Sequence, residues 1–369
     1  MIELSSLERK YGDFYVPAFK VEVDGQDLVR ELYLTVTGVE VDLKQKAAGR
    51  FTFTVANSFD WKKRGFAASN DKSIDLIKLF TFGKNVKVFF GYGDATGLTL
   101  MLQGIITELA TSFSEGGTPE LTVSGYDELF QLSTGKSSRH WEKKRDSEVV
   151  SDLVAITSLS RSITQTDPVK NRIDMTQESE LAFLTKIAER NAATFYVRGE
   201  EFFFGPRKND KTAQVSLGWG KGLLTFSPEA NLARQVQAVE VHGRSIENGE
   251  PILGKASAGD ETGTDASADG GAETVAAALN TKPTMRVRAA VHTQAEADER
   301  ARAILEERSQ EFVKGSGDCI GLPEIVPDIN VALTDLGSPF SKTYYVDSAR
   351  HKVDGGGYRT SFTVKETGI

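Results

Sequence analysis

Apolar and polar positions alternate most clearly in residues 315–364, near the end of the chain. Three short apolar runs lie there, at 330–333, 343–346 and 358–364, each bounded by Gly, Pro or Asp. In the last run every second residue is apolar or can be buried, which is the period of a β-strand with one buried and one solvent-exposed face. The glycines at 355–357 supply the positive φ that a tight reversal needs. The pattern predicts a small closed or sandwiched antiparallel sheet.

The first third of the chain shows the same strand pattern. Phe51, Phe53 and Val55 alternate with polar residues. Turn signals recur about every ten residues, as in a barrel or a sandwich. Gly91 and Gly93 follow one strand but open no helix, so they indicate a hairpin turn rather than a phosphate-binding loop. These features predict a first β domain over residues 1–135. Its expected strands are 14–23, 32–43, 50–56, 84–92, 99–113 and 121–126.

The hydrophobic period changes after residue 135. Asp146 or Ser147 can cap a helix whose apolar positions include Val149, Val150, Leu153 and Val154. A second helix is expected at 177–191, followed by a hairpin of strands 195–197 and 201–204. This α/β module, 146–206, predicts an insert domain over 136–212. Its aromatic residues are expected in the hairpin and helix core, with a ligand platform as the alternative.

Strands resume at 213–243 and 285–291, and a helix is expected to run from Thr293 to about residue 312 because Thr293 and Glu296 form a capping box. Residues 244–282 are rich in Gly, Ala, Asp, Thr and Ser and poor in large apolar residues, so they predict a flexible surface loop. Together with the closing strands, these elements predict a second β domain over 213–369, interrupted by loop 244–282. The expected fold class is β-rich α+β, with two β domains bracketing an α/β insert.

Composition narrows the class of protein. The chain has 369 residues, so two or more domains are expected, and its net charge of −8 argues against a general nucleic-acid-binding surface. The N-terminus lacks the apolar core of a signal peptide, and the chain lacks the run of about 18 apolar residues that a membrane span needs. The basic cluster 139–145 is expected to be a solvated connector, with contact to an acidic partner as the alternative.

Few residues have the pattern of reactive chemistry. Cys319 is the single cysteine, so no intrachain disulfide forms and the fold suits a reducing cytoplasm. The four histidines are in no His-Glu-x-x-His motif, and no Gly-x-Ser-x-Gly motif occurs. His351 is expected to be a hydrogen-bonded residue at a strand end rather than a ligand or base. We therefore expect no enzyme activity and no catalytic, cofactor-binding or metal-binding residues, although 52 acidic residues leave a glycosidase pair possible by count.

An ordered set of motifs resembles the hub proteins of contractile tails, that is, the phage late control protein D family and the hub part of VgrG-type spike proteins. The best match is Gly337-Ser338-Pro339-Phe340 with the Tyr344-Tyr345-Val346 and Gly355-Gly356-Gly357-Tyr358 that follow it. The other stretches, in chain order, are 89–92, 102–106, 151–154, 181–184, 188–191, 195–197 and 293–298. They extend over almost the whole length of the chain.

This resemblance implies two similar antiparallel, tube-like β-barrels in each chain. It also implies a homotrimer with pseudo-six-fold symmetry that adapts the hexameric inner tube to the trimeric spike. The expected partners are inner tube proteins, other baseplate proteins and a spike, which is expected to be a separate polypeptide because the chain stops at Ile369, just after the hub pattern. Assembly is expected in the bacterial cytoplasm, as part of a phage tail or an injection particle, with no nucleic-acid specificity, no membrane insertion and no cofactor.

Two other classes of function stay open at this point. The first is a tail-associated peptidoglycan hydrolase or glycan-binding module that uses residues 146–206 to recognise the cell wall. The second is a carbohydrate-binding sandwich unrelated to tails.

Overall fold

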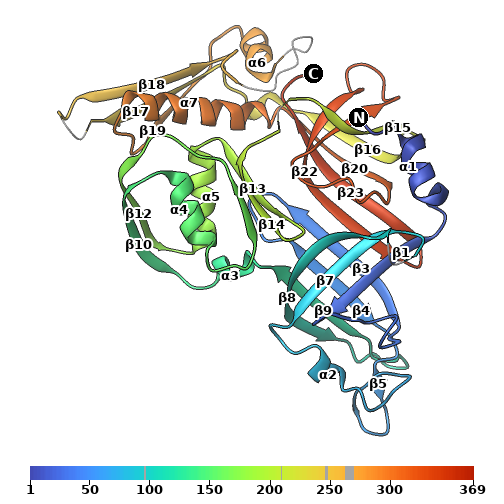
Figure 1. Cartoon of the computed structure of the whole chain (residues 1–369). Helices are drawn as coiled ribbons and strands as arrows, with labels where there is room; N and C mark the ends of the chain where they lie inside the picture. The colour runs from blue at the N-terminus through green and yellow to red at the C-terminus, as the bar shows by residue number, and fades with distance from the viewer. Residues whose placement is uncertain (95–96, 209, 246–247, 262–269) are drawn as a thin grey trace.

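A computed structural model describes residues 1–94, 97–208, 210–245, 248–261 and 270–369. Its main feature is one 13-stranded sheet that passes through two β units (Figure 1). The N-terminal helix α1 (Leu4–Lys10) lies beside this sheet. No helix among the described residues is long and apolar enough to cross a membrane.

The first β unit is an open sheet built from the strands that the alternating pattern predicts. Phe51, Phe53 and Val55 are buried, as expected, and the polar residues between them face outward. Across the unit the strands are β2 (Gln26–Asp27), β1 (Pro17–Val23), β7 (Asn85–Tyr92), β8 (Thr99–Thr111), β9 (Leu121–Asp127), β4 (Arg50–Val55) and β3 (Val36–Lys44). Within the described residues, β1 and β3 are not paired with each other, so a closed first barrel is a wrong expectation.

The second β unit is a closed six-stranded barrel, as expected. Its strands run β22 (Lys342–Asp354), β21 (Asn330–Thr334), β15 (Ala213–Trp219), β16 (Gly222–Ala230), β20 (Val313–Ile320) and β23 (Gly357–Glu366), and β23 pairs back onto β22. The barrel is not purely antiparallel, because β15 runs parallel to β21. Parallel neighbours need a long connection, and the long stretch of chain between β15 and β21 supplies it.

The β22–β23 hairpin joins the two units. The C-terminal half of β22 pairs with β3, with Ala349 opposite Leu43 and Val353 opposite Val39. The hairpin turns at Gly357, whose φ of 101° suits only glycine. Strand β1 lies beside the same hairpin, so the hairpin fills the open side of the first unit. One hydrophobic core therefore continues through both units.

His351 lies in this joint, within β22 rather than at a strand end. It is completely buried, and its Nε2 lies 2.9 Å from the carbonyl oxygen of Ile325. Since a carbonyl only accepts, Nε2 carries the proton and Nδ1 accepts a hydrogen bond from the hydroxyl of Tyr358 at 2.9 Å. The hydroxyl of Thr360 lies 3.1 Å from the same Nδ1. Burial lowers the pKa of His351 to about 4, so the ring is neutral in the folded protein. The predicted hydrogen-bonded role is confirmed.

The insert packs two helices against two small sheets. Helix α4 (Asp146–Val154) forms as predicted, but its N-cap is Arg145, so neither Asp146 nor Ser147 caps it. Helix α5 (Glu180–Arg190) is capped by Ser179. Strands β13 (Ala193–Arg198) and β14 (Glu201–Pro206) form the expected hairpin, and β11 (Ser160–Ile163) joins it. The basic cluster 139–145 is mostly a strand, not a connector: β10 (Ser137–Lys144) pairs with β12 (Lys170–Glu178). The reason is that Trp141, within this charged run, stacks on Phe183 of α5 at 5.7 Å.

A separate α/β layer occupies much of the predicted second β domain. Strands β18 (Pro251–Ser257), β17 (Ala238–Arg244) and β19 (Thr284–Arg288) form their own sheet, and α7 (Gln294–Ser309) covers it with a distinct core. These strands and this helix are therefore not part of the second barrel, contrary to the prediction.

The region predicted as a flexible loop, 244–282, contains β18 and helix α6 (Gly271–Leu279); residues 246–247 and 262–269 of that region lie outside the described residues. Within the described part of this region, a small residue lets β18 pack closely on α7. A side chain at Gly254 would lie 2.2 Å from the backbone of Ala297 in α7. Composition alone therefore misreads the region, since a shortage of large apolar residues does not prevent burial.

The neutral, buried His351 predicts a stability that falls in acid. Its pKa is about 4 when folded against 6.5 for the free side chain, so protonation favours the unfolded state as the pH falls from 6.5 toward 4. We expect the free energy of unfolding to drop by about 2 kcal/mol between pH 7 and pH 5 from this group alone. Urea titrations of the wild type and of His351→Gln measure it. The variant should be less stable at pH 7, but its free energy of unfolding should fall less between pH 7 and pH 5. An equal fall in both proteins would contradict this role of His351.

Candidate assembly surfaces

The residues that most often carry chemistry are scattered or buried. Cys319 is completely buried in β20, and burial raises the pKa of its thiol well above the usual range. Histidines 140, 242 and 292 lie on β10, on β17 and just before α7, far apart in the chain, while His351 is in the core. Within the described parts of the chain, no group of three or more His, Cys, Asp or Glu residues is placed to hold a metal ion. The prediction of no catalytic or ligand-binding residues stays a prediction.

The aromatic residues of the insert are core residues, as expected. Phe195, Phe202 and Phe204 are completely buried between the hairpin and the helices. Phe203 stacks on Tyr196, with ring centres 5.1 Å apart. These rings are therefore used in packing and do not form an exposed platform for a sugar.

A buried polar network joins the insert to both β units. Asp328 is completely buried, and its carboxylate accepts hydrogen bonds from the hydroxyls of Tyr196 in β13 and Tyr345 in β22, at 3.0 and 2.9 Å. The backbone N–H of Lys208 also donates to this carboxylate, at 3.1 Å. Burial and then the charge of Asp328 raise the pKa of both tyrosines, so both remain hydroxyl donors. A buried carboxylate is stable only when such donors surround it.

Gln45 extends this network to the first β unit. It lies in the turn between β3 and β4, and its carbonyl oxygen accepts from Thr194 of β13 at 2.6 Å. The hydroxyl of Tyr345 lies 3.0 Å from the same oxygen. The amide of Gln45 donates to the carbonyl of Val346 at 3.1 Å. The network therefore fixes the three parts at one junction.

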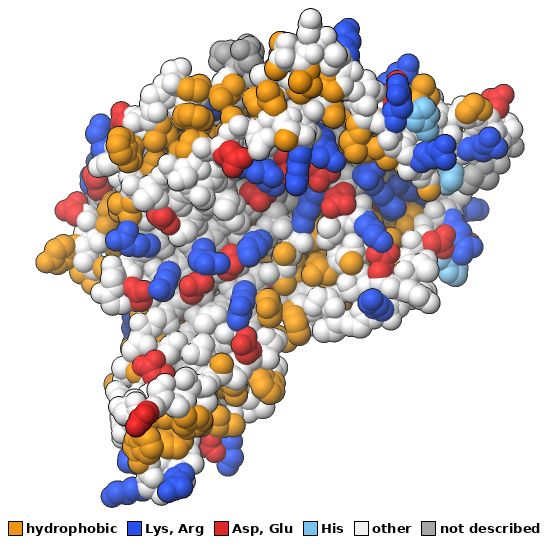
Figure 2. All heavy atoms as spheres, turned by 180° about the vertical axis from the view of Figure 1, so that it is seen from behind, with side chains coloured by type: hydrophobic (Ala, Val, Ile, Leu, Met, Phe, Trp, Pro, Cys, Tyr) orange, Lys and Arg blue, Asp and Glu red, His pale blue; other side chains and the backbone are white. Residues whose placement is uncertain are grey.

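An exposed aromatic cluster, the aromatic tip, lies at the far end of the first β unit. It consists of Phe59, Trp61, Phe66 and Phe113, whose rings contact edge to face at 5.2–6.2 Å. Trp61 is 63% exposed and Phe113 is 66% exposed. Figure 2 shows hydrophobic side chains gathered at this lower end of the molecule, with cationic side chains beside them. Exposed aromatic clusters of this kind are typical of interaction surfaces.

The turn between β5 (Phe59–Asp60) and β6 (Gly65–Phe66) places cations on the same tip. Lys62, Lys63 and Arg64 are all exposed there. Asp60 is buried and fixes the turn, because its carboxylate accepts from the backbone N–H groups of Lys62 and Lys63 at 2.8 and 3.3 Å. These hydrogen bonds hold the pKa of Asp60 below its usual range. The tip is therefore an ordered, cationic, aromatic protrusion.

A hollow of about 440 Å³, the barrel hollow, lies on the second β unit. Trp219 and Leu224 at its edge are 61% and 40% exposed. Phe226 packs edge to face against the buried ring of Tyr344, with ring centres 5.2 Å apart. The hollow also contains the carboxylate of Asp335, 3.5 Å from Lys221. Its lining residues are Trp219, Leu224, Thr225, Phe226, Ser227, Asp335 and Leu336.

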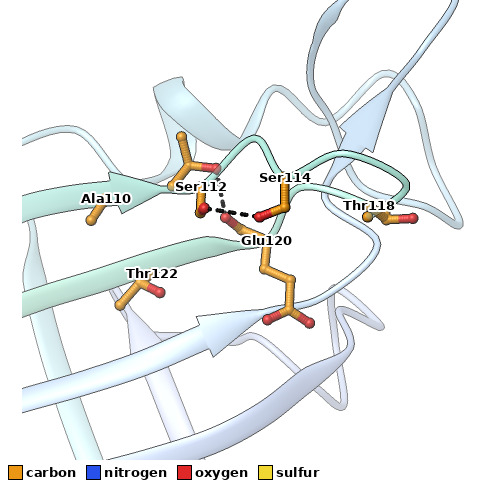
Figure 3. A pocket seen from close by; sticks show the side chains of 8 residues that line it. Ala110, Ser112, Ser114, Thr118, Glu120 and Thr122 are labelled. Carbon is orange, nitrogen blue, oxygen red and sulfur yellow. Dashed lines mark hydrogen bonds between the residues drawn. The ribbon is translucent and has the colours of Figure 1, made fainter.

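A second hollow, of about 420 Å³, lies between the ends of β8 and β9 (Figure 3). The hydroxyls of Ser112 and Ser114 point toward one another at 3.3 Å, and that of Thr111 donates to the carbonyl of Glu120 at 2.7 Å. The carboxylate of Glu120 points away from the serine hydroxyls (Figure 3). These polar groups do not converge on one point in the hollow.

A polar face extends over both units where they join. On β22, Arg350 lies 3.3 Å from Asp42 of β3, and on β23 Lys365 lies 2.8 Å from Asp347. Hydroxyl groups also pair on this face, such as Ser348 with Thr363 at 2.7 Å. These four charged groups are paired with one another, so they give the face little net charge.

Solved structures with this fold come from tails and from a secretion system. A 43 kDa tail protein of prophage MuSo2 from Shewanella oneidensis aligns with a TM-score of 0.69 and 14% identity, covering 95% of this chain and 98% of that one. A tail protein from Neisseria meningitidis MC58 aligns with a TM-score of 0.66 and 14% identity, covering 95% and 97%. The E. coli c3393 protein, a component of the type VI secretion system, aligns with a TM-score of 0.57 and 10% identity, covering 95% and 78%.

At these identities the likeness shows the fold, so the chain has the fold of tail proteins and of this secretion component. The predicted resemblance to tail hub proteins is confirmed at this level. A family model described as the Alg8 N-terminal domain matches residues 14–355, and the chain belongs to this family. A search of curated proteins finds no match.

The junction network predicts a measurable loss on removal of a single hydroxyl. Tyr196→Phe takes one donor from the buried carboxylate of Asp328, and we expect the free energy of unfolding to fall by about 1.5–3 kcal/mol. Tyr33→Phe, at an exposed tyrosine, is the matched control and should leave it unchanged. Urea denaturation at pH 7 measures both. An unchanged midpoint for Tyr196→Phe would contradict the role assigned to the network.

Proposed function

We propose that this chain is a structural hub subunit in the baseplate of a contractile phage tail or contractile injection system. It acts as a homotrimer that adapts the hexameric inner tube to the trimeric spike. The observation that carries this proposal is the match over nearly the whole of both chains to the 43 kDa tail protein, 95% and 98%, at a TM-score of 0.69. A non-enzymatic role is also supported by the tail proteins that share the fold.

The joined β units provide the physical basis. Each has six main strands, and the β22–β3 pairing holds them side by side in one chain. Three such chains present six β units around an axis, which matches a six-fold tube on one side and a three-fold spike on the other. The paired charges of the polar face suit a hydrated channel, because they offer few unpaired groups for a passing protein to bind.

The finer assignments belong to the same proposal. The partners are a spike protein, the inner tube and further baseplate proteins. The particle assembles in the bacterial cytoplasm. The chain divides into 1–135, 136–212 and 213–369, with the separate α/β layer of β17, β18, β19 and α7 held within the third part.

The oligomeric state tests this function most simply. We expect mass photometry of the purified protein to show a species of about 120 kDa, three times the 40.2 kDa chain. With spike and tube proteins added, the trimer should enter a larger complex. A protein that stays monomeric and binds neither partner would contradict the proposal. Clearing of peptidoglycan in a zymogram by this chain alone would favour the hydrolase alternative instead.

A further inference from the structure

The geometry points to a head-to-tail contact between copies: we propose that the aromatic tip of one chain docks into the barrel hollow of the next chain. This inference rests on the proposed homotrimer and identifies the surfaces that form it. It commits to one occupant for the hollow, a second copy of this chain.

The tip has the features of a binding surface on the inserting side. It is convex, projecting at the end of the first β unit, away from the rest of the chain (Figure 1). Trp61 and Phe113 are nearly two-thirds exposed although they contact other rings, so a large apolar area stays uncovered in the single chain. Trp and Arg are enriched among the residues that dominate protein interfaces, and both occur on this tip.

The hollow has the complementary features. It is concave, and its apolar lining includes Trp219, Leu224 and Phe226. The ion pair of Asp335 with Lys221 is long and exposed, and pairs of this kind contribute little, so Asp335 is available to a new cation. Lys62, Lys63 and Arg64 on the tip are such cations.

Charge and shape together decide between the possible pairings of these two surfaces. A tip-to-tip contact would bring three cations of one copy against three of another. A hollow-to-hollow contact would oppose two concave surfaces, and each Asp335 in it already lies beside Lys221. Only the tip-to-hollow contact fits a convex surface to a concave one and brings the cations of the tip to a carboxylate.

The positions of the two surfaces also favour a ring. The tip belongs to the first β unit and the hollow to the second, at opposite ends of the joined body (Figure 1). A contact between two different surfaces is heterologous, and repeated contacts of this kind close into a ring or continue as a filament. Closure after three copies is what the proposed hub requires.

Mixing two complementary variants tests the inference. The tip variant is Trp61→Ala/Phe113→Ala, and the hollow variant is Leu224→Lys, which opposes a cation to the cationic tip. Alone, each variant should be monomeric by mass photometry, because its copies lack either an intact tip or an intact hollow. Mixed in equal amounts, they should form dimers of about 80 kDa and no trimers, since one intact tip and one intact hollow remain per pair. Dimers in the hollow variant alone would overturn the inference in favour of a tip-to-tip contact.

Controls separate this inference from the proposed function. Tyr33→Ala changes another exposed aromatic residue and should remain trimeric, and all variants should melt as the wild type does because the substituted side chains are exposed. If the wild type and both variants are all trimers, the inference fails and the proposed function stands. If the wild type never forms trimers, the proposed function fails. Trp61-dependent binding to anionic lipid vesicles without self-association would also overturn the inference, in favour of a lipid surface.

Discussion

The pairing of β22 with β3 is the contact on which the rest of the architecture depends. These strands are about 300 residues apart in the sequence, yet their backbones pair over residues 348–353 of β22. The same hairpin supplies Tyr358, which lies against Phe90 and Tyr92 of the first unit at 5.4 and 5.6 Å. The first sheet would otherwise leave an unpaired edge and an open core, both of which are costly. One β-hairpin therefore turns two β units into a single body.

The hydrogen-bond network around Asp328 and Gln45 fixes the relative orientation of the insert and the two β units. Hydrophobic contacts are non-directional, whereas the carboxylate of Asp328 and the amide of Gln45 accept and donate along fixed directions. The ion pairs of Asp146 with Lys170 and Arg190 do the same inside the insert, where Asp146 is nearly fully buried. The proposed role, in which the subunit transmits force between a tube and a spike, needs such fixed angles between its parts.

Local patterns in the sequence predict local structure well here. The strand with Phe51, Phe53 and Val55 and the helix with Val149, Val150, Leu153 and Val154 are found where expected, because strand and helix periods depend on neighbouring residues. The β22–β3 pairing carries no local signal, so the sequence could not show that the first unit stays open. Gly254 in β18 was misread for the same reason, since its role depends on the distant helix α7.

The two candidate surfaces also differ in how far the sequence predicts them. Trp61 and the following Lys62, Lys63 and Arg64 are consecutive residues, so this part of the tip is visible in the sequence. The barrel hollow has no such signal, because Trp219 and Asp335 come together only when β15 and β21 pair. Overall similarity to tail proteins was predictable because its motifs are ordered along the whole chain.

The most direct test of the account is a cryo-electron microscopy reconstruction of the purified oligomer, refined first without imposed symmetry. The account predicts three chains around an open axial channel, with the six β units at similar radius and the β22–β3 joint intact within each chain. Three chains whose β units lie at different radii, or with no axial channel between them, would contradict it.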